Sequence, residues 1–449
     1  MREISALRRT LSLPDAGERM YGFVSELYPI CRSLTGDGVR KTLAMIRARI
    51  PVETREVPSG TRVFDWTIPK EWNITEAWIK APGGRRVVDF AESNLHVVGY
   101  SMPVHATVTL AQLKQHLFTL PERPHWIPYR TSYFNDEWGF CMSHSRMMAL
   151  EEGSYEVRID SSLSDGAMSY GEFLLEGESP DEVLISTHVC HPSLCNDNLS
   201  GIAVATELAA QLRSVRRRYS YRFLFIPATL GSIAWLALNE EAARGIRHGL
   251  VLAGVGDAGR VTYKQSRRGD SEIDRAATYV LRTSGQDCQI TPFVPYGYDE
   301  RQYCSPGFDL PVGVLMRTPH GRYAEYHTSA DDLSFVQPAF LADSLHKCVA
   351  VLSVLENDGV YVSRNPLCEP QLGRRGLYRS YGERGGEPDR EMALLWVLNL
   401  ADGNHSLLDI AERSSIGFEA VRLAADILIE HGLLEERPDN EHPESRGRA

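Results

Sequence analysis

Hydrophobic residues change their spacing along the chain, and each spacing predicts a different kind of element. Within residues 1–55, "GERMYGFVSELYPICRS" and "GVRKTLAMIRARI" carry apolar positions three and four residues apart, the spacing of amphipathic helices. Residues 60–178 instead hold short β-type runs, such as "TRVFDWTI" and "YEVRID", between proline and glycine turns, with many aromatic residues. We expect this segment to be a β-rich insertion, either a plain surface module or a lid over a substrate.

From about residue 180 to 357, strand-like and helix-like segments alternate. Buried strands are predicted at "DEVLIST", "YRFLFIPA", "HGLVLAGVG" and "VGVLMRTP". Helices are predicted at "NLSGIAVATELAAQLRSV", "GSIAWLALNEEAA", "SEIDRAATYVLRTSG" and "PAFLADSLHKCVAVLSVLEN". This alternation predicts an α/β fold with a doubly wound, mainly parallel sheet and helices on both faces. Ligands of such sheets bind at the carboxyl ends of the strands.

The last part of the chain predicts a linker and a small helical unit. Residues 364–388 are rich in glycine, arginine and proline, and three helical segments follow, which indicates a winged helix-turn-helix. The tail "PDNEHPESRGRA" is expected to be disordered. The predicted domains are an α/β domain at 1–60 and 179–360, an insertion at 61–178, a linker at 361–387 and a winged helix-turn-helix at 388–437.

Charge and cysteine content narrow the classes of partner and compartment. The formal net charge of −11 argues against a general nucleic-acid binder and against docking on anionic lipid. No apolar run is long enough for a membrane span, and the charged N-terminal segment does not resemble a signal peptide. The eight cysteines are scattered, unlike those of a disulfide scaffold. We expect a cytoplasmic protein with reduced thiols.

The predicted winged unit is acidic, which bears on its partner. Between Pro388 and Arg437 there are ten acidic and four basic residues, and Arg422 is the only basic residue in the last predicted helix. A DNA-recognition helix needs Arg, Lys, Asn or Gln side chains for phosphate and base contacts. We therefore expect this unit to mediate homo-oligomerisation or to bind a protein partner, and we do not expect it to bind DNA.

Four residues of metal-binding type fall at or beyond predicted strand ends. His188 follows "DEVLIST" at its end, Asp197 opens the next helix in "NDNLSG", Asp257 ends "GVGD" and His327 lies in "YHTSADD". Imidazole and carboxylate together are typical ligands of Zn²⁺ and similar divalent ions. The spacing therefore predicts a metal site, with ordinary structural histidines as the alternative.

This arrangement resembles the co-catalytic zinc aminopeptidase family, which includes the glutaminyl cyclases, over about residues 180–357. The chain is still more similar to a bacterial subgroup of aminopeptidase-like polysaccharide-biosynthesis proteins. That similarity extends over nearly the whole chain and includes "CRSLTGDGVR", "YFNDEWGFC", "THVCHPSLCNDNLSG", "YDERQYCSPG" and the C-terminal winged helix. The resemblance implies a zinc-peptidase-like fold and zinc-dependent cleavage of an amide bond.

The chain departs from that family at its paired glutamates. By resemblance, the general base and one metal ligand fall at Ala228 and Thr229 in "FIPATLGS", and neither is a carboxylate. Cys190 replaces the aspartate that would orient the first histidine. One metal position keeps its full set of ligands and the other does not, so we expect one Zn²⁺ rather than two. The ligands that the resemblance implies are His188, Asp197, Asp257 and His327.

Without a glutamate at position 228, another group must accept the proton or hydrolysis is lost. The candidates are Glu325, two residues before His327, together with Asp299 and Glu300 in "YGYDERQYC". A solvated loop residue is the alternative for Glu325. His191 is a further candidate, but we expect it to lie behind the ligands and to donate a hydrogen bond to one of them.

The cysteines of the same stretch permit another interpretation. Cys190, His191 and Cys195 could belong to a structural zinc site, but no Cys-x-x-Cys pair supplies the remaining ligand. A Cys–His nucleophilic pair lacks any supporting signature. We expect thiols without a special role.

Substrate-binding residues are predicted in three motifs. Arg301 in "YGYDERQYC", Arg32 in "CRSLTGDG" and Arg130 in "IPYRTSY" could each bind a substrate carboxylate, with structural ion pairing as the alternative. Tyr298 and Tyr326 could form walls of the pocket or simply pack.

The resemblance implies a zinc-dependent hydrolase of an amide or peptide bond in a small amino-acid conjugate or peptide. Because the usual glutamates are missing, two alternatives stay open. One is non-hydrolytic amide chemistry, such as cyclisation or transfer, and the other is a ligand-binding or regulatory role.

Overall fold

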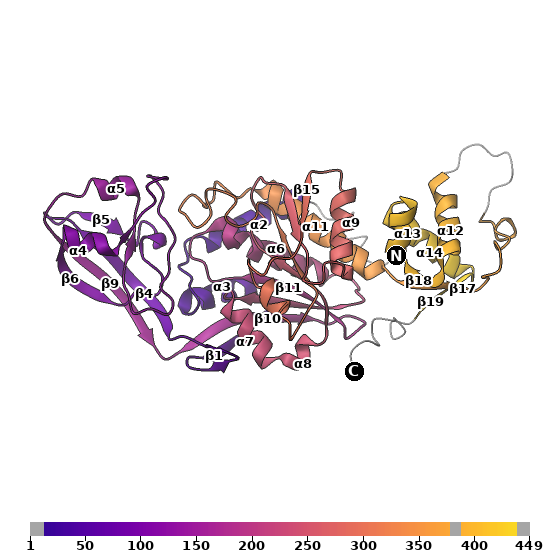
Figure 1. Ribbon diagram of the computed structural model, residues 1–449, viewed down its shortest axis with the longest axis horizontal. Helices are drawn as coiled ribbons and strands as arrows, with labels where there is room; N and C mark the ends of the chain where they lie inside the picture. The colour runs from indigo at the N-terminus through magenta and orange to yellow at the C-terminus, as the bar shows by residue number, and fades with distance from the viewer. Residues whose placement is uncertain (1–12, 378–387, 438–449) are drawn as a thin grey trace. The chain divides into compact units, whose positions relative to one another are not determined.

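The computed structural model describes residues 13–377 and 388–437 (Figure 1). Within the described residues, the contacts divide the chain into two compact units, residues 13–349 and residues 350–377 with 388–437. The expected disordered tail and residues 378–387 of the expected linker lie outside the described residues.

An eight-stranded mixed sheet forms the centre of the first unit. Its strand order is β1-β10-β12-β11-β13-β16-β14-β15. The pairs β11–β12, β11–β13, β13–β16 and β14–β15 are parallel, whereas β1, β10 and the β14–β16 junction are antiparallel. The strands are β1 (Glu53–Pro58), β10 (Ala167–Leu175), β11 (Glu182–His188), β12 (Ser220–Ile226), β13 (Ile246–Leu252), β14 (Val261–Lys264), β15 (Cys288–Thr291) and β16 (Val312–Met316). The predicted doubly wound, mainly parallel core is therefore confirmed.

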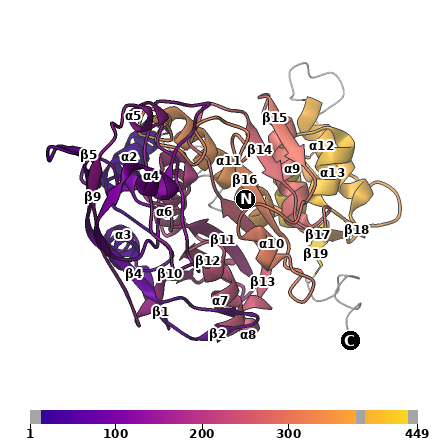
Figure 2. The ribbon, with the colours of Figure 1, turned by 60° about the vertical axis from the view of Figure 1, so that its left-hand side comes forward.

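Helices cover both faces of this sheet. Every residue of β11 and of β12 is buried, as expected of strands enclosed on two sides. Figure 2 shows α6 and α7 on opposite sides of these strands. The helices of the domain are α2 (Leu13–Leu27), α3 (Asp37–Arg47), α6 (Ser200–Leu212), α7 (Leu230–Leu238), α8 (Glu240–Ala243), α9 (Glu272–Thr283), α10 (Glu300–Tyr303) and α11 (Pro338–Asn357). Among the described helices, α11 is long and apolar enough to cross a membrane, but 72% of its most apolar window is buried inside the protein, as in a core helix.

The insertion forms a separate antiparallel sheet of order β5-β4-β9-β6. Its strands are β4 (Glu71–Lys80), β5 (Arg86–Asp89), β6 (Val104–Thr109) and β9 (Ser154–Ser164). The short elements η1 (Asn94–His96), α4 (Leu110–Leu113), η2 (Lys114–His116), β7 (Leu117–Phe118), β8 (Phe140–Cys141) and α5 (His144–Met148) complete it. Its own core includes Ile79, Phe140 and Tyr155.

The expected boundaries of the insertion, 61–178, are too wide at both ends. Strand β10 pairs with β1 and β12 in the central sheet, so it belongs to the α/β domain. The hairpin of β2 (Arg62–Val63) and β3 (Trp66–Thr67) places Val63 and the following Ile68 in the same core as Trp235. The β-type pattern continues across both boundaries although the strand partners change, and this is why the pattern alone misplaced them.

The second unit contains the winged helix-turn-helix. A sheet of order β18-β17-β19 packs with three helices. The elements are β17 (Val360–Ser363), η4 (Gly373–Arg375), α12 (Pro388–Leu400), β18 (Asp402–Ser406), α13 (Leu407–Ser414), α14 (Phe418–Glu430) and β19 (Leu434–Glu436). The linker was expected to begin at residue 361, but this residue lies in β17. That strand pairs with β18 and β19, about forty and seventy residues later in the chain, so it belongs to the winged unit and not to the linker.

Candidate metal and catalytic site

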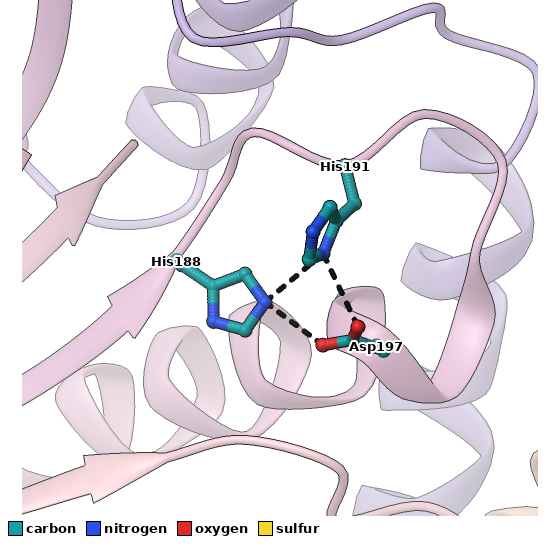
Figure 3. Close-up of side chains that lie close together, drawn as sticks. All are labelled: His188, His191 and Asp197. Atoms are coloured by element: carbon teal, nitrogen blue, oxygen red, sulfur yellow. Dashed lines mark hydrogen bonds and ion pairs between the residues drawn. The ribbon is translucent and has the colours of Figure 1, made fainter. Parts of the chain in front are cut away.

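The first two candidate ligands lie at the carboxyl end of β11. His188 is the last residue of that strand, and Asp197 lies in the irregular turn η3 (Cys195–Leu199) that leads into α6. Figure 3 shows the two side chains pointing toward each other, with the ring of His191 from the intervening loop above them. His188 Nε2 lies 2.9 Å from Asp197 Oδ1 and 3.1 Å from His191 Nδ1, and His191 Nδ1 lies 3.4 Å from Asp197 Oδ2. These candidate ligand atoms all lie within 4.8 Å of one another.

His327 completes a ring of nitrogen atoms around the same carboxylate. It lies between β16 and α11, and its Nε2 is 3.0 Å from Asp197 Oδ2. Burial alone would raise the pKa of Asp197, but the three neighbouring imidazoles outweigh burial and hold that pKa well below its usual range. The result is an ionised, fully buried carboxylate beside three nitrogen donors, a set of atoms that fits Zn²⁺.

His191 lies closer to the candidate ligands than expected, and Asp257 accepts several hydrogen bonds from its neighbours. His191, expected behind the ligands, offers Nδ1 directly to the cluster. The carboxylate of Asp257 is buried and accepts hydrogen bonds from Thr318 Oγ1 at 2.6 Å, Gly259 N at 2.7 Å and Asn196 Nδ2 at 3.0 Å. Neighbouring donors therefore already engage both oxygens of Asp257, and its role as a metal ligand stays a prediction.

Arg32 holds the loop that carries His191. Its side chain is 2% exposed, and it donates to the backbone carbonyls of His191 at 2.8 Å, Pro192 at 2.9 Å and Leu27 at 2.8 Å. Burial lowers the pKa of its guanidinium to about 10. The predicted role of Arg32 in binding a substrate carboxylate is therefore replaced by a role in positioning the loop.

Asp331 holds the turn that carries Asp197. Its buried carboxylate accepts hydrogen bonds from the backbone N–H groups of Asn196 at 2.6 Å and Asp197 at 3.0 Å. Burial raises the pKa of Asp331 to about 8. Asp331 is not among the site residues predicted from the sequence, although it lies in the same "YHTSADD" motif as His327.

Asp299 reaches the region that lacks the family's glutamates. It precedes α10, is fully buried, and accepts a hydrogen bond at its Oδ1 from Ser232 Oγ at 2.7 Å. Ser232 Oγ also lies 2.7 Å from the backbone carbonyl of Thr229. The other oxygen, Oδ2, has no hydrogen-bond partner among the described residues. Burial is the main reason why the pKa of Asp299 rises to about 7.

The other two candidate bases are less well placed. Glu300 is buried and bound to Lys264, whose Nζ lies 2.6 Å from Glu300 Oε1. Glu325 is half-buried, and its backbone carbonyl accepts from Thr328 N at 3.0 Å and Thr328 Oγ1 at 2.8 Å. Asp299 and Glu300 are both fully buried and each has one oxygen without a hydrogen-bond partner among the described residues. Asp299 is linked through Ser232 to the loop of Ala228 and Thr229, whereas Glu300 is bound to Lys264.

Aromatic rings surround the histidines. Tyr298 stacks on His188 with ring centroids 5.4 Å apart, and Tyr326 stacks on His327 at 3.9 Å. Tyr129, which is not among the site residues predicted from the sequence, meets the rings of His191 and His327 edge-on. Its only sequence signal is its place next to Arg130 in "IPYRTSY".

A pocket of about 380 Å³ opens beside His327. The insertion supplies part of its wall, including Phe118, Tyr129 and Arg130, and Tyr326 lines it from the α/β domain. The guanidinium of Arg130 lies 4.4 Å from the ring centroid of Phe118. The insertion therefore adjoins the candidate site, as a lid would.

Arg301, on α10, is half-buried, and its Nε has no hydrogen-bond partner among the described residues.

Comparison with known proteins agrees with this architecture. A family described as "Domain of unknown function (DUF4910)" matches residues 21–358, and one described as "winged helix-turn-helix" matches residues 359–436. A Clostridium acetobutylicum protein named "Putative polysaccharide biosynthesis protein with aminopeptidase-like domain" is 49% identical over 420 residues, 94% of this chain and 96% of the relative.

Solved structures share the fold. The crystal structure of a "putative peptidase" from Clostridium acetobutylicum has a TM-score of 0.92 at 47% identity, covering 97% of this chain and 99% of that chain. A zinc aminopeptidase from Bacillus subtilis has a TM-score of 0.55 at 13% identity, covering 76% and 95%, which is a likeness of fold alone. The expected resemblance is confirmed: the chain belongs to the family described as "Domain of unknown function (DUF4910)", with an aminopeptidase-like α/β domain and a C-terminal winged helix-turn-helix.

Proposed function

We propose that this protein is a metal-dependent hydrolase that cleaves an amide or peptide bond in a small amino-acid conjugate or peptide. The observation that carries the proposal is the buried carboxylate of Asp197 with three imidazole nitrogens within 3.4 Å. The aminopeptidase-like fold and the adjoining pocket support it. Three of the side chains of His188, His191, His327 and Asp197 would hold one Zn²⁺ and leave a position open, and such an ion would polarise the carbonyl of the bond to be cleaved.

Asp299 is the proposed general base. A water adds to the carbonyl carbon while Asp299 Oδ2 takes its proton, and the same proton passes to the leaving nitrogen as the C–N bond breaks. A pKa of about 7 suits both steps, because the group accepts and returns a proton near neutral pH. The hydrogen bond from Ser232 to Oδ1 fixes the carboxylate and leaves Oδ2 for the water.

The insertion is proposed to orient the substrate from the wall of the pocket that it supplies. Tyr129 and Arg130 line the pocket together with Tyr326, next to His327. Aromatic rings at these positions exclude water from the reacting bond, and the exposed Arg130 offers a guanidinium at the wall of the pocket.

The absence of a carboxylate at positions 228 and 229 is the observation that favours a second candidate. A protein with this fold that has lost its base could carry out cyclisation or transfer, or bind a ligand without turnover. Loss of hydrolysis with retention of the metal separates these roles from the first proposal.

The test combines metal analysis with an assay of aminoacyl-anilide cleavage by purified protein. We expect about one zinc per chain and metal-dependent turnover, with strong losses in His327→Ala and Asp299→Asn. Glu325→Gln tests the rival base, and Asp165→Asn, a substitution at an exposed turn, is the matched control. Both should retain activity. Stoichiometric zinc without turnover, or full activity in His327→Ala, would overturn the proposal.

We also propose that the winged unit binds protein or a second copy of the chain. Arg422, the sole basic residue of α14, is paired with Asp426 and donates to Tyr361 Oη at 2.6 Å. Its side chain is only 14% exposed, so this guanidinium is not presented for phosphate contact.

A further inference from the structure

Three polar side chains from separate segments converge on Gly297. A methyl group at that position would lie 2.8 Å from Glu300 Oε1, 3.2 Å from Lys264 Nζ and 3.4 Å from His320 Cε1. Glu300 comes from α10, Lys264 ends β14, and His320 lies in the loop after β16. Arg301, the next residue of α10, lies with its guanidinium 5.8 Å from the ring centroid of Tyr296, the residue before Gly297. Together with Arg301, these residues are called the Gly297 cluster.

The cluster holds buried polar atoms without hydrogen-bond partners. Glu300 Oε2, Arg301 Nε and His320 Nδ1 are three of the eleven such side-chain atoms in the described part of the chain, and the nearby Asp299 Oδ2 is a fourth. Buried polar groups are normally paired, so a concentration of unpaired donors and acceptors indicates a place that a polar ligand fills. Glu300 itself is fully buried.

The Gly297 cluster lies one aromatic ring away from the metal ligands. The ring of Tyr298 is 5.4 Å from that of His188 on one side and 5.3 Å from that of His320 on the other. These separations are within the length of a small substrate that has its reacting bond at the histidines and a neighbouring group at the cluster.

The unpaired donors of the cluster select the class of that group. Lys264 Nζ donates to Glu300 Oε1 at 2.6 Å and to the carbonyl of Tyr296 at 2.7 Å, which leaves one N–H without an acceptor among the described residues. Arg301 Nε is a second donor without a partner among them. Two such donors match the two oxygens of a single carboxylate, whereas a phosphate carries a third oxygen that they do not satisfy.

We propose that the Gly297 cluster binds a carboxylate of the substrate, with Arg301 and His320 as donors and Glu300 accepting from an amine or hydroxyl beside it. The substrate class is then an amide of an acidic, polar compound, such as an amino dicarboxylic acid or a uronic acid. The assignment of the cleaved bond rests on the proposed function, whereas the binding of the carboxylate does not.

The test measures binding by calorimetry on the full chain after removal of metal, so that carboxylate–zinc contacts do not contribute. The probes are glutarate, its neutral diamide and glycerol phosphate. Glutarate should bind about tenfold more tightly than the diamide, and also more tightly than the phosphate ester. Equal binding of the diamide, or tighter binding of the phosphate ester, overturns the proposal.

Variants assign the binding to the cluster. Arg301→Gln and Gly297→Ala should each weaken glutarate binding about tenfold, while Arg301→Lys retains part of it. Arg244→Gln makes the same chemical change at an exposed position of the helix end and should have no effect. His320→Gln replaces Arg301→Gln if circular dichroism shows that the latter is unfolded. Unchanged affinity in the folded variants contradicts the assignment.

The outcome is separable from that of the proposed function. Arg301-dependent binding of glutarate without amide cleavage supports the cluster and rejects the hydrolase. Metal-dependent cleavage of neutral conjugates, with no binding of glutarate, rejects the cluster alone.

Discussion

Asp299→Asn is expected to stabilise the protein while it removes activity. The buried carboxyl has a pKa of about 7, against an ordinary value of 3.8. The unfolded chain therefore loses this proton about three pH units before the folded protein does. At about 1.36 kcal/mol per unit, the free energy of unfolding falls by roughly 4 kcal/mol between about pH 4 and pH 7 because of this group.

The sign follows from which state binds the proton. Below about pH 4, Asp299 is protonated in both the folded and the unfolded protein, and it then does not lower the free energy of unfolding. Above about pH 7 both are ionised, and the folded state bears the full penalty of the buried charge. Asparagine carries no charge and can keep the contact with Ser232, so the variant should lack this penalty.

The assay is urea unfolding of metal-free protein at several pH values. At pH 8 the variant should be more stable by roughly 2–4 kcal/mol, and the difference should vanish near pH 4. Asp165→Asn, at an exposed turn, should show no such dependence. For the wild type with metal, kcat/KM should rise with pH along the ionisation of Asp299, and any activity left in the variant should not show this rise. A variant no more stable than the wild type at pH 8 would refute the reasoning about the buried carboxyl.

Three further predictions follow from the loops and the winged unit. Arg32→Met removes the guanidinium donors of three carbonyls, of which those of Leu27 and Pro192 keep a backbone N–H donor while that of His191 does not. Unfolding experiments should therefore show a loss of roughly 1–3 kcal/mol, and competition with a chromophoric chelator should show weaker zinc binding. Unchanged values would contradict its role. Asp331→Ala removes the acceptor of two backbone N–H groups, those of Asn196 and Asp197. The free energy of unfolding should fall by roughly 2–4 kcal/mol, and zinc should bind more weakly. An unchanged zinc affinity would contradict the role of Asp331 in positioning Asp197. The full chain should not shift duplex DNA in gels. Binding to DNA whose affinity falls steeply with salt concentration would contradict the proposal that the winged unit binds protein.

The parts of the site that lie at strand ends could be predicted from the sequence. Carboxyl ends of parallel strands share one edge of a sheet, so His188 at the end of β11 and His327 beyond β16 had to lie near each other. Asp197 follows for the same reason, because it opens the helix after β11.

What the sequence left undecided depends on contacts between distant segments. The direction of the Asp257 carboxylate is determined by Thr318, 61 residues later, and the loop of His191 is held by Arg32, 159 residues earlier. Neither contact can be predicted from the residues next to Asp257 or His191 in the sequence. The insertion boundaries were wrong for a related reason, since β10 continues the alternation of β9 but pairs in another sheet.

Zinc titration of turnover tests the central claim most directly. Protein stripped of metal is titrated with Zn²⁺ while cleavage of a panel of amino-acid amides, acidic and neutral, is measured. The account predicts no cleavage without metal, full activity at about one zinc per chain, and no activity at any zinc level in His327→Ala. Tight uptake of zinc with no cleavage of any amide, or cleavage that is the same with and without metal, would contradict it.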